Sequence, residues 1–510
     1  MEYFDLLYPS EEKRIQGRKK SISKSLLSDL QMHELVKNGL IEETDYQFLM
    51  TEMEYLPTDP EIIQYRQTIL LDLIRNPIFM NEFENLCTTL REKVTDKKYD
   101  IWEPATPIYK NLLEYIRVLS LNKHILFNTK LTIEHEMESD LFRNVLDFLQ
   151  TEDYSKALSE IITQMKSVLE SDAIQYRVSY AYGKVIQYLE IDVVHSDQVA
   201  PTIKKRGLLK KNIVNDSNLI SADNIILSNN LNEMYTKTII KLCELAARLN
   251  NVIVLPLKKM AKELRYYRIA IKIYNLCNEA RIHQCMPDLT QRSRGGLAIN
   301  QLCPLQLFQP RMQRSLTTND YSNEDGKIAI ITGANSGGKT IFIQSLGIAQ
   351  IFMQLGYFVP AMSYDADVMN YIGSLFTNIE DVDTIHGKLE QELVDVKEIA
   401  KELKPNSMLL MNEILATTSE KEAAQIMAEI IRAFSVSESN ILCATHMCSF
   451  AEMVEDKTLI LESGQKAINY IAEQRVDENN KRYNTYHIVK GKPNRIMLED
   501  ELIQKYIPTK

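Results

Sequence analysis

The stretch that decides the fold is "KIAIITGANSGGKT", residues 327–340. A short apolar run rich in β-branched residues ends in glycine, and the eight residues from Gly333 to Thr340 fit the pattern G-x-x-x-x-G-K-[ST]. A helical apolar pattern follows, so the segment has the strand–loop–helix context in which this pattern binds phosphate. Glycine is scarce here, with 16 in 510 residues, which makes a glycine-rich turn that binds nothing the less favoured interpretation.

The residue types of this loop suit a bound nucleotide. Backbone N–H groups can close around phosphate oxygens, and the helix that begins there directs its positive N-terminal end at the same anion. Lys339 can neutralise charge on the β- and γ-phosphates, and the Thr340 hydroxyl can ligate Mg²⁺. The predicted nucleotide contacts are Gly333, Ala334, Asn335, Ser336, Gly337, Gly338, Lys339 and Thr340.

A second apolar run, "LLMNEILATTS" at residues 409–419, ends in an asparagine and a glutamate. A P-loop ATPase needs an acidic residue at such a strand end to hold Mg²⁺, and a group that orients the attacking water. Asn412 and Glu413 stand at this position. His446 ends a third run, "NILCATH", and could contact the γ-phosphate, although a purely structural role is the alternative for a histidine taken alone.

Ser419 carries a structural prediction instead of a catalytic one. The motif "SEKE" (419–422) fits S-x-x-E before an apolar helical face, the signature of a capping box. We therefore expect Ser419 to cap a helix.

Composition bounds the class of protein. The 510 residues suggest two to four domains, and 45% apolar with 25% charged residues is ordinary for a globular chain. A net charge of −10 gives no support for a strongly basic nucleic-acid surface. No apolar run reaches the roughly 18–20 residues of a membrane span, and the seven cysteines form no CxxC pair. These features predict a cytoplasmic protein without a membrane partner or a zinc site.

The predicted secondary structure of the chain changes near residue 287. Residues 1–286 read as mostly helical, and Pro256 is expected to break or kink a pattern that runs over 229–281. This pattern fits a long helical arm or an ordinary helical domain. Beyond residue 287, helical patterns alternate with apolar runs, which predicts a parallel sheet with a terminal hairpin over 467–489. The predicted strands of the sheet are 327–333, 407–413, 440–446 and 458–464.

At this point the chain resembles the MutS family. The segment "ITGANSGGKTIFIQSLGIAQIFMQLGYFVPA" (331–361) is similar to the ATPase domain of that family, and further segments follow in the same order. The resemblance is specific over about 290–460 and weaker over 50–290. The supporting segments are "YRQTILLDL" (65–73), "TTND" (317–320), "LFTNIEDVDTI" (375–385), "NEILATTS" (412–419) and "ATH" (444–446).

The resemblance implies a mainly α core and lever region, residues 1–286, and an α/β P-loop ATPase domain of the ABC type, residues 287–510. A reduced clamp insertion would fall at about 195–228. Two subunits would sandwich ATP and Mg²⁺ head to tail as a homodimer, and the core would transmit the nucleotide state to bound DNA.

The resemblance also implies roles for single residues. Glu413 would act on the water, Lys339 on the phosphates, and His446 would sense the γ-phosphate. Thr340 and Asn412 would hold Mg²⁺, the latter through water. Leu316 would lie near the adenine.

The chain departs from the family pattern in ways that matter for turnover. Asn412 stands where the family has aspartate, and an amide brings no charge to the metal. The segment 386–403 lacks the serine or threonine of the family signature, although its apolar spacing still predicts an amphipathic helix. We also find no counterpart of the Phe-x-Glu mismatch-reading element and no motif of a nuclease domain.

Three hypotheses follow. The first is a MutS-like ATPase that couples ATP binding and hydrolysis to DNA binding in repair or recombination. The second is a weakly hydrolysing switch or scaffold that acts on a protein partner. The third, an ABC-type chromosome-maintenance ATPase of another kind, fits the segment order less well. For DNA contact the best electrostatic candidates are Lys204, Lys205, Arg206, Lys210 and Lys211, with a solvated loop as the alternative.

Overall fold

A computed structural model of the chain divides into two compact units, Met1–Asp5 with Asn76–Lys262, and Leu6–Arg75 with Glu263–Lys510. Among the described residues, no helix is both long and apolar enough to cross a membrane. The described residues are 4–93, 108–170, 174–181, 185–193, 221–289, 296–310, 315–377, 385–415, 419–478 and 482–493.

The first unit is helical, with one antiparallel hairpin. Aromatic side chains build part of its core, because Phe142 meets Phe79 and Phe83 edge-on at ring distances of 5.1 and 5.6 Å. These residues lie on one face of their helices, as an amphipathic pattern requires. The elements are α6 (Pro77–Lys93), α7 (Ile108–Asn128), α8 (Asp140–Gln150), α9 (Glu152–Glu170), β1 (Ile174–Ala181), β2 (Val185–Val193) and the first part of α11 (Ser221–Glu279).

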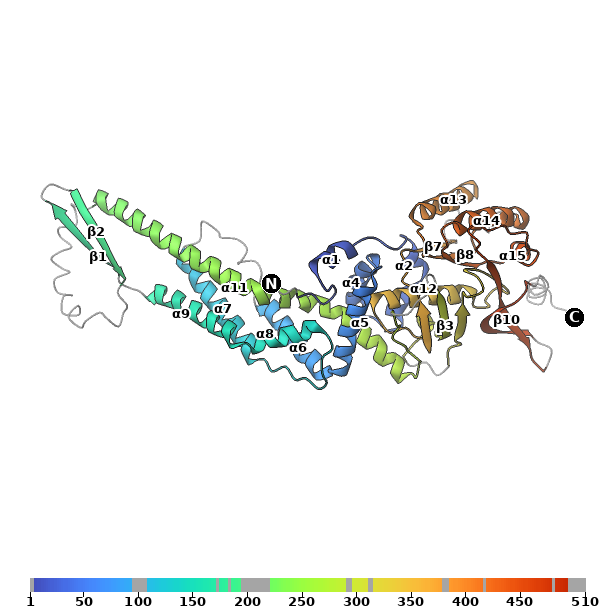
Figure 1. The fold of residues 1–510 in the computed structure, drawn as a ribbon, viewed down its shortest axis with the longest axis horizontal. Helices are drawn as coiled ribbons and strands as arrows, with labels where there is room; N and C mark the ends of the chain where they lie inside the picture. Colours follow the sequence, from blue (N-terminus) through green and yellow to red (C-terminus); the bar gives the residue numbers. More distant parts are fainter. Residues whose placement is uncertain are drawn as a thin grey trace. The chain divides into compact units, whose positions relative to one another are not determined.

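Helix α11 continues through Pro256 as a single helix (Figure 1), so the expected break is wrong, whereas the alternative of a kink stays a prediction. A proline inside a helix removes one backbone hydrogen bond and costs about 3 kcal/mol. Fully buried apolar residues flank this position on both sides, namely Ile253, Val254, Leu257 and Met260. Their packing offsets the local cost, so the sequence rule that a proline ends a helix fails here.

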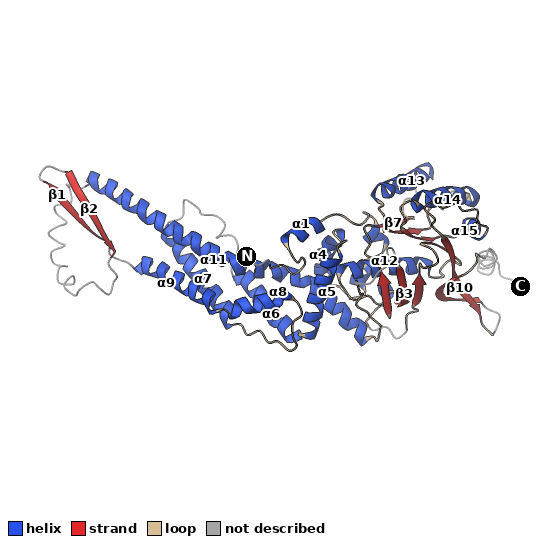
Figure 2. Cartoon of the chain, in the orientation of Figure 1, coloured by secondary structure: helices blue, strands red, loops and turns tan. Residues whose placement is uncertain are grey.

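The second unit contains the predicted parallel sheet, with strand order β11-β10-β5-β9-β8-β7. All neighbours pair in parallel except β10 and β11, which form the predicted antiparallel hairpin. Figure 2 shows these strands among the helices that cover them. The strands are β5 (Ile328–Thr332), β7 (Ile372–Phe376), β8 (Met408–Asn412), β9 (Asn440–Ala444), β10 (Ala467–Val476) and β11 (Arg482–Lys490).

Helices cover both faces of this sheet. Helix α12 (Lys339–Leu355) lies on one face, and α13 (Ile385–Glu402), α14 (Glu420–Ser435) and α15 (Cys448–Glu455) lie on the other (Figure 1). Successive side chains of a strand point to opposite faces. Accordingly, Leu410 of β8 approaches α12 at Gly347, whereas Leu409 and Met411 join the core beneath α14.

A smaller sheet of β3 (Leu297–Leu302), β4 (Asn319–Ser322) and β6 (Ser363–Ala366) is antiparallel, in the order β4-β3-β6.

The prediction of a strand at 458–464 is wrong, since β10 begins only at Ala467. Ser463 and Gly464 take successive left-handed conformations, with φ of 55° and 67°. Two such residues form a turn and cannot continue a strand.

N-terminal segments complete the second unit. The buried guanidinium of Arg66 donates from Nε to the carbonyl of Leu7 and from Nη1 to the Tyr266 hydroxyl, both at 3.0 Å. The Tyr266 hydroxyl in turn donates to the Leu355 carbonyl at the end of α12. The elements are α1 (Glu11–Gly17), α2 (Leu26–Asp29), α3 (Glu34–Lys37), α4 (Glu43–Glu54), α5 (Pro60–Arg75) and the end of α11.

The contacts therefore group residues 6–75 and the end of α11 with the α/β part of the chain. The domain boundary between residues 286 and 287 rests on the sequence pattern, and this grouping by contacts does not test it. It stays a prediction. The expected clamp insertion at 195–228 lies outside the described residues up to residue 220, and 221–228 belong to α11.

Candidate nucleotide-binding site

The glycine-rich loop connects the buried strand β5 to α12, as its sequence predicts. Two glycines are required by the geometry. A Cβ at position 337 would lie 2.8 Å from the Cβ of Ala472 and 3.0 Å from the carbonyl oxygen of Ala334. Gly338 is the N-cap of α12 with φ of 95°, a conformation that favours glycine. Because this cap residue has no side chain, the first N–H groups of α12 remain available to an anion.

Lys339 is buried in this loop, with 5% of its surface exposed. Its Nζ donates to the carbonyls of Gly333 and Ala334, at 2.9 and 3.2 Å, and lies 3.8 Å from Oε1 of Glu413. The ammonium group is therefore held over the loop, between the peptide oxygens and the carboxylate. A phosphate that entered the loop could replace the two carbonyls as its acceptor.

Thr340 and Asn412 meet across the site. The Thr340 hydroxyl donates to Oδ1 of Asn412 at 2.9 Å, across 72 residues of sequence. Parallel pairing of β8 with β9 puts Asn412 at the same sheet edge as the end of β9, opposite Ala444. The two oxygens are hard donors of the kind that Mg²⁺ accepts, so the chemistry of the pair fits the metal. Both are neutral, and they lack the charge that a carboxylate would supply.

Glu413 and His446 form a tight pair at the ends of β8 and β9. Oε2 of Glu413 lies 2.5 Å from Nδ1 of His446 and accepts from the backbone N–H of the same residue at 3.2 Å. Burial favours a higher pKa for Glu413, but the hydrogen bond from His446 and the charge of Lys339 outweigh it and lower this pKa. The hydrogen bond to Glu413 raises the pKa of His446 against the effect of burial. The carboxylate is thus kept ionised and fixed in direction.

These side chains line one cavity of about 840 Å³. The residues that line it include Asn335 to Phe342 of the loop and helix, together with Asn412, Glu413 and His446. The structure therefore brings the sequence-predicted catalytic and metal residues, and most of the predicted phosphate contacts, to a single place. Their roles in binding and hydrolysis stay predictions.

One wall of the cavity was not foreseen. Tyr486 of β11 and apolar residues near β3 line it, namely Leu302, Pro304 and Leu307. The side chain of Asn319 links β4 to β11, since it donates to the Tyr486 carbonyl at 3.1 Å and accepts from Ile488 N at 2.8 Å. The motif "TTND" contains Asn319 and could have drawn attention to it. Leu316 also lines this part of the cavity, and its contact with an adenine stays a prediction.

Two other predicted sites stand apart. The basic residues from Lys204 to Lys211 lie outside the described part of the chain. Ser419 is the N-cap of α14, as expected, but its hydroxyl donates to Oε2 of Glu422 at 2.8 Å and makes no capping bond to the backbone. The prediction of a capping box therefore gives the right N-cap residue, but the predicted bond between the serine side chain and the helix backbone is wrong.

The fold is that of an α/β domain with a glycine-rich loop between β5 and α12, consistent with a P-loop ATPase-like domain. The chain also matches the family models "MutS domain V" over residues 329–495 and "MutS2 N-terminal domain" over residues 58–279. It belongs to the MutS family.

Two of the similar proteins are named DNA mismatch repair proteins, and a third is named an endonuclease. The chain is 23% identical over 419 residues to a protein of Saccharomyces cerevisiae named DNA mismatch repair protein MSH3, covering 79% of this chain and 40% of that protein. It is 25% identical over 373 residues to the DNA mismatch repair protein MutS of Prochlorococcus marinus, covering 68% and 39%. For the endonuclease MutS2 of Ligilactobacillus salivarius the identity is 25% over 205 residues, covering 37% and 25%. The chain thus spans less than half the length of these relatives.

Proposed function

We propose that this protein is an ATPase that couples ATP binding and hydrolysis to DNA binding in repair or recombination. The observation that carries the proposal is the convergence of the glycine-rich loop, the Thr340–Asn412 pair and the Glu413–His446 pair on one cavity. A structural turn would not require a buried lysine, a fixed carboxylate and an uncapped helix N-terminus at the same place.

In this proposal ATP is held through its phosphates. The loop from Gly333 to Gly338 surrounds them with N–H groups, and Lys339 exchanges its two peptide acceptors for phosphate oxygens. The wall formed by Leu302, Leu307 and Tyr486 offers an apolar and aromatic surface that suits a purine base.

Thr340 and Asn412 would hold Mg²⁺, which neutralises charge on the β- and γ-phosphate oxygens when it is bound. Asn412 already accepts the Thr340 hydroxyl, as a metal-site aspartate would, but contributes no negative charge. We therefore propose that the metal is held weakly and that turnover is slow.

Glu413 would orient the attacking water and accept its proton. The pairing with His446 keeps the carboxylate ionised and directed toward Lys339, with 3.8 Å between Oε1 and Nζ. His446 would sense the γ-phosphate and pass its presence to Glu413, because movement of either paired side chain changes the position of the other.

The DNA half of the proposal is supported by the family and by the names of the relatives, two of which are DNA mismatch repair proteins. The basic segment that contains Lys204 and Lys211 is the proposed contact with the phosphate backbone. We further propose a homodimer through the ATPase domains, in the cytoplasm. The free thiols of Cys277, Cys285, Cys303 and Cys443 suit that reducing compartment.

Mg·ATP turnover measured with no DNA and with duplex, mismatched and branched DNA tests the proposal. We expect slow basal hydrolysis that at least one DNA changes, and DNA affinity that falls steeply with salt. Replacing the five basic residues of 204–211 by alanine should reduce the salt slope. A protein that binds no DNA at low salt contradicts the DNA half.

The second candidate function is an ATP-dependent switch or scaffold that acts on a protein partner. Asn412 favours it, because a metal site without charge can bind nucleotide and hydrolyse little. This candidate predicts tight ATP binding, negligible turnover and no response to any of the DNA substrates. The same assay therefore separates the two functions.

A further inference from the structure

A carboxylate outside the predicted catalytic set joins two parts of the site. Glu392 lies on α13, where Oε2 accepts the backbone N–H of Leu415 at 3.0 Å and Oε1 lies 3.2 Å from the Thr377 hydroxyl. Thr377 follows β7, and Leu415 belongs to the turn that follows β8. This turn begins with Glu413, so Glu392 contacts the backbone of the segment that carries the proposed catalytic carboxylate.

The turn needs support, because its backbone is strained. Glu413 and Leu415 have φ of 53° and 64°, in the left-handed region that side-chain-bearing residues rarely adopt. Such conformations persist where the surrounding structure holds them. Three hydrogen bonds do so here: Glu413 N to the Ala444 carbonyl at 2.9 Å, the Thr377 hydroxyl to the Glu413 carbonyl at 2.6 Å, and Leu415 N to Glu392.

The bond to Leu415 is the essential contribution of Glu392. The Thr377 hydroxyl has one proton, and its shorter contact is with the Glu413 carbonyl. The amide of Leu415 donates to the Glu392 carboxylate, a side chain of α13 that is distant in sequence from the turn. Removing Glu392 would leave this partly buried N–H without that acceptor and free the end of the turn.

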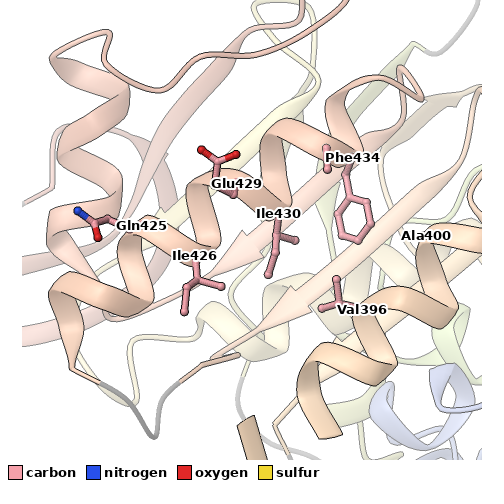
Figure 3. A pocket seen from close by; sticks show the side chains of 8 residues that line it. Val396, Ala400, Gln425, Ile426, Glu429, Ile430 and Phe434 are labelled. Carbon is pink, nitrogen blue, oxygen red and sulfur yellow. The ribbon is translucent and has the colours of Figure 1, made fainter. Parts of the chain in front are cut away.

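An apolar groove of about 460 Å³ lies between α13 and α14. Figure 3 shows Val396 of α13 facing Ile430 and Phe434 of α14 across it. The contact of α13 with α14 is thus apolar, whereas Glu392 gives α13 a polar connection to the turn after β8.

We propose that Glu392 is a positioning residue that holds the turn after β8, so that the Glu413 carboxylate stays directed at Lys339 and His446. The effect on catalysis rests on the proposed ATPase function, whereas the effect on the turn does not. A shift of α13 would then be transmitted to Glu413 through the Leu415 amide.

The test uses the full chain and hydrogen exchange followed by mass spectrometry. In Glu392→Ala, we expect a peptide that covers residues 409–415 to exchange roughly tenfold faster or more, with the β9 peptide unchanged. Glu392→Gln should stay close to the unsubstituted protein, because its side-chain oxygen can still accept from Leu415. Glu390→Ala, an exposed position on the same helix, is the matched control and should change nothing.

Steady-state kinetics provide the second readout. We expect kcat of Glu392→Ala to fall roughly ten- to hundredfold, with KM for ATP changed by less than about twofold, since a displaced catalytic group affects the chemical step. Glu392→Gln should restore most of kcat.

Exchange in residues 409–415 that Glu392→Ala leaves unchanged overturns the proposal. Faster exchange with unchanged kcat overturns the catalytic role alone. If the unsubstituted protein hydrolyses no ATP, the proposed function fails while exchange still decides on the turn. Should Glu392→Ala unfold, Thr377→Val removes a second support of the turn, and we then expect a smaller increase in the same peptide; an unchanged peptide contradicts the account.

Discussion

The two halves of the proposed nucleotide site differ in the charged groups that they contain. The phosphate half, from Gly333 to Thr340, has its buried lysine and its uncapped helix N-terminus in place. The metal and water half, at the ends of β8 and β9, has a fixed carboxylate in Glu413 but an amide at Asn412. In the proposed function, binding of ATP and its hydrolysis can therefore be separated, because each would depend on a different half.

The largest effect is expected in the phosphate half. Lys339→Ala removes the ammonium group that is held over the loop, and hydrogen bonds to charged groups contribute about 1.5–3 kcal/mol each. We expect ATP affinity to fall roughly hundredfold or more, measured by calorimetric titration. Lys327→Ala is the control, because Lys327 precedes β5 and its Nζ donates to the Glu438 carbonyl at 3.3 Å in an exposed hydrogen bond. Equal affinities in the two variants would place ATP elsewhere.

In the other half, Glu413→Gln should stop residual hydrolysis without preventing binding. A positioned general base contributes typically 10²–10⁴-fold, so we expect kcat to fall within about that range. Calorimetric titration should give ATP affinity within about threefold of the unsubstituted protein, because the phosphate half is intact. Full activity of this variant would remove Glu413 from its proposed role.

Asn412→Asp is expected to raise turnover, whereas the two preceding substitutions should lower binding or turnover. A charged oxygen beside Thr340 should bind Mg²⁺ more tightly and raise Mg²⁺-dependent turnover roughly tenfold, or about 1.4 kcal/mol in activation free energy. Asn412→Ala loses the acceptor for the Thr340 hydroxyl and should lower turnover. A phosphate-release assay over a series of Mg²⁺ concentrations measures both. Unchanged turnover in Asn412→Asp would mean that Asn412 is not beside the metal.

The smallest effect concerns pH. The pKa of His446 is raised by Glu413 and that of Glu413 is lowered, chiefly through the bond from His446 that overcomes the effect of burial. The histidine contribution to stability is complete below its unfolded pKa and is lost as pH rises through the raised pKa. The carboxylate contribution is present above its unfolded pKa and is lost as pH falls through the lowered one. The pair is therefore most stabilising between the two folded-state values.

Nuclear magnetic resonance of the imidazole protons checks this directly. In Glu413→Gln we expect the pKa of His446 to move back toward its ordinary value. Chemical unfolding across the pH range should show the stability gap between the two proteins shrinking at both ends. A histidine that titrates identically in both proteins would show that the pair is not formed.

Much of the second unit follows from local sequence. The strands β5, β8 and β9 are short apolar runs because they are buried on both faces, and such runs are visible without any partner. The glycine-rich loop and the ends of these strands were therefore recognisable. The continuation of α11 through Pro256 was not, because packing around the proline decides it.

The rest of the site depends on contacts between distant residues. Asn319 reaches Tyr486 across 167 residues, and Glu392 meets the turn of Glu413 through a backbone amide. A single asparagine or glutamate gives no periodic signal for such a contact. Ser419 has a recognisable motif that predicts its position as the helix cap. The motif does not determine the hydrogen-bond partner of its hydroxyl, which is Oε2 of Glu422.

The most direct test of the account is to mix the unsubstituted protein with Mg·ATP and to determine how much nucleotide is bound and how much of it is still ATP. The account predicts bound nucleotide that remains mostly ATP over minutes, because the phosphate half is complete and Asn412 limits the metal half. No bound nucleotide would contradict the site itself. Rapid and complete conversion to ADP would contradict the limit assigned to Asn412.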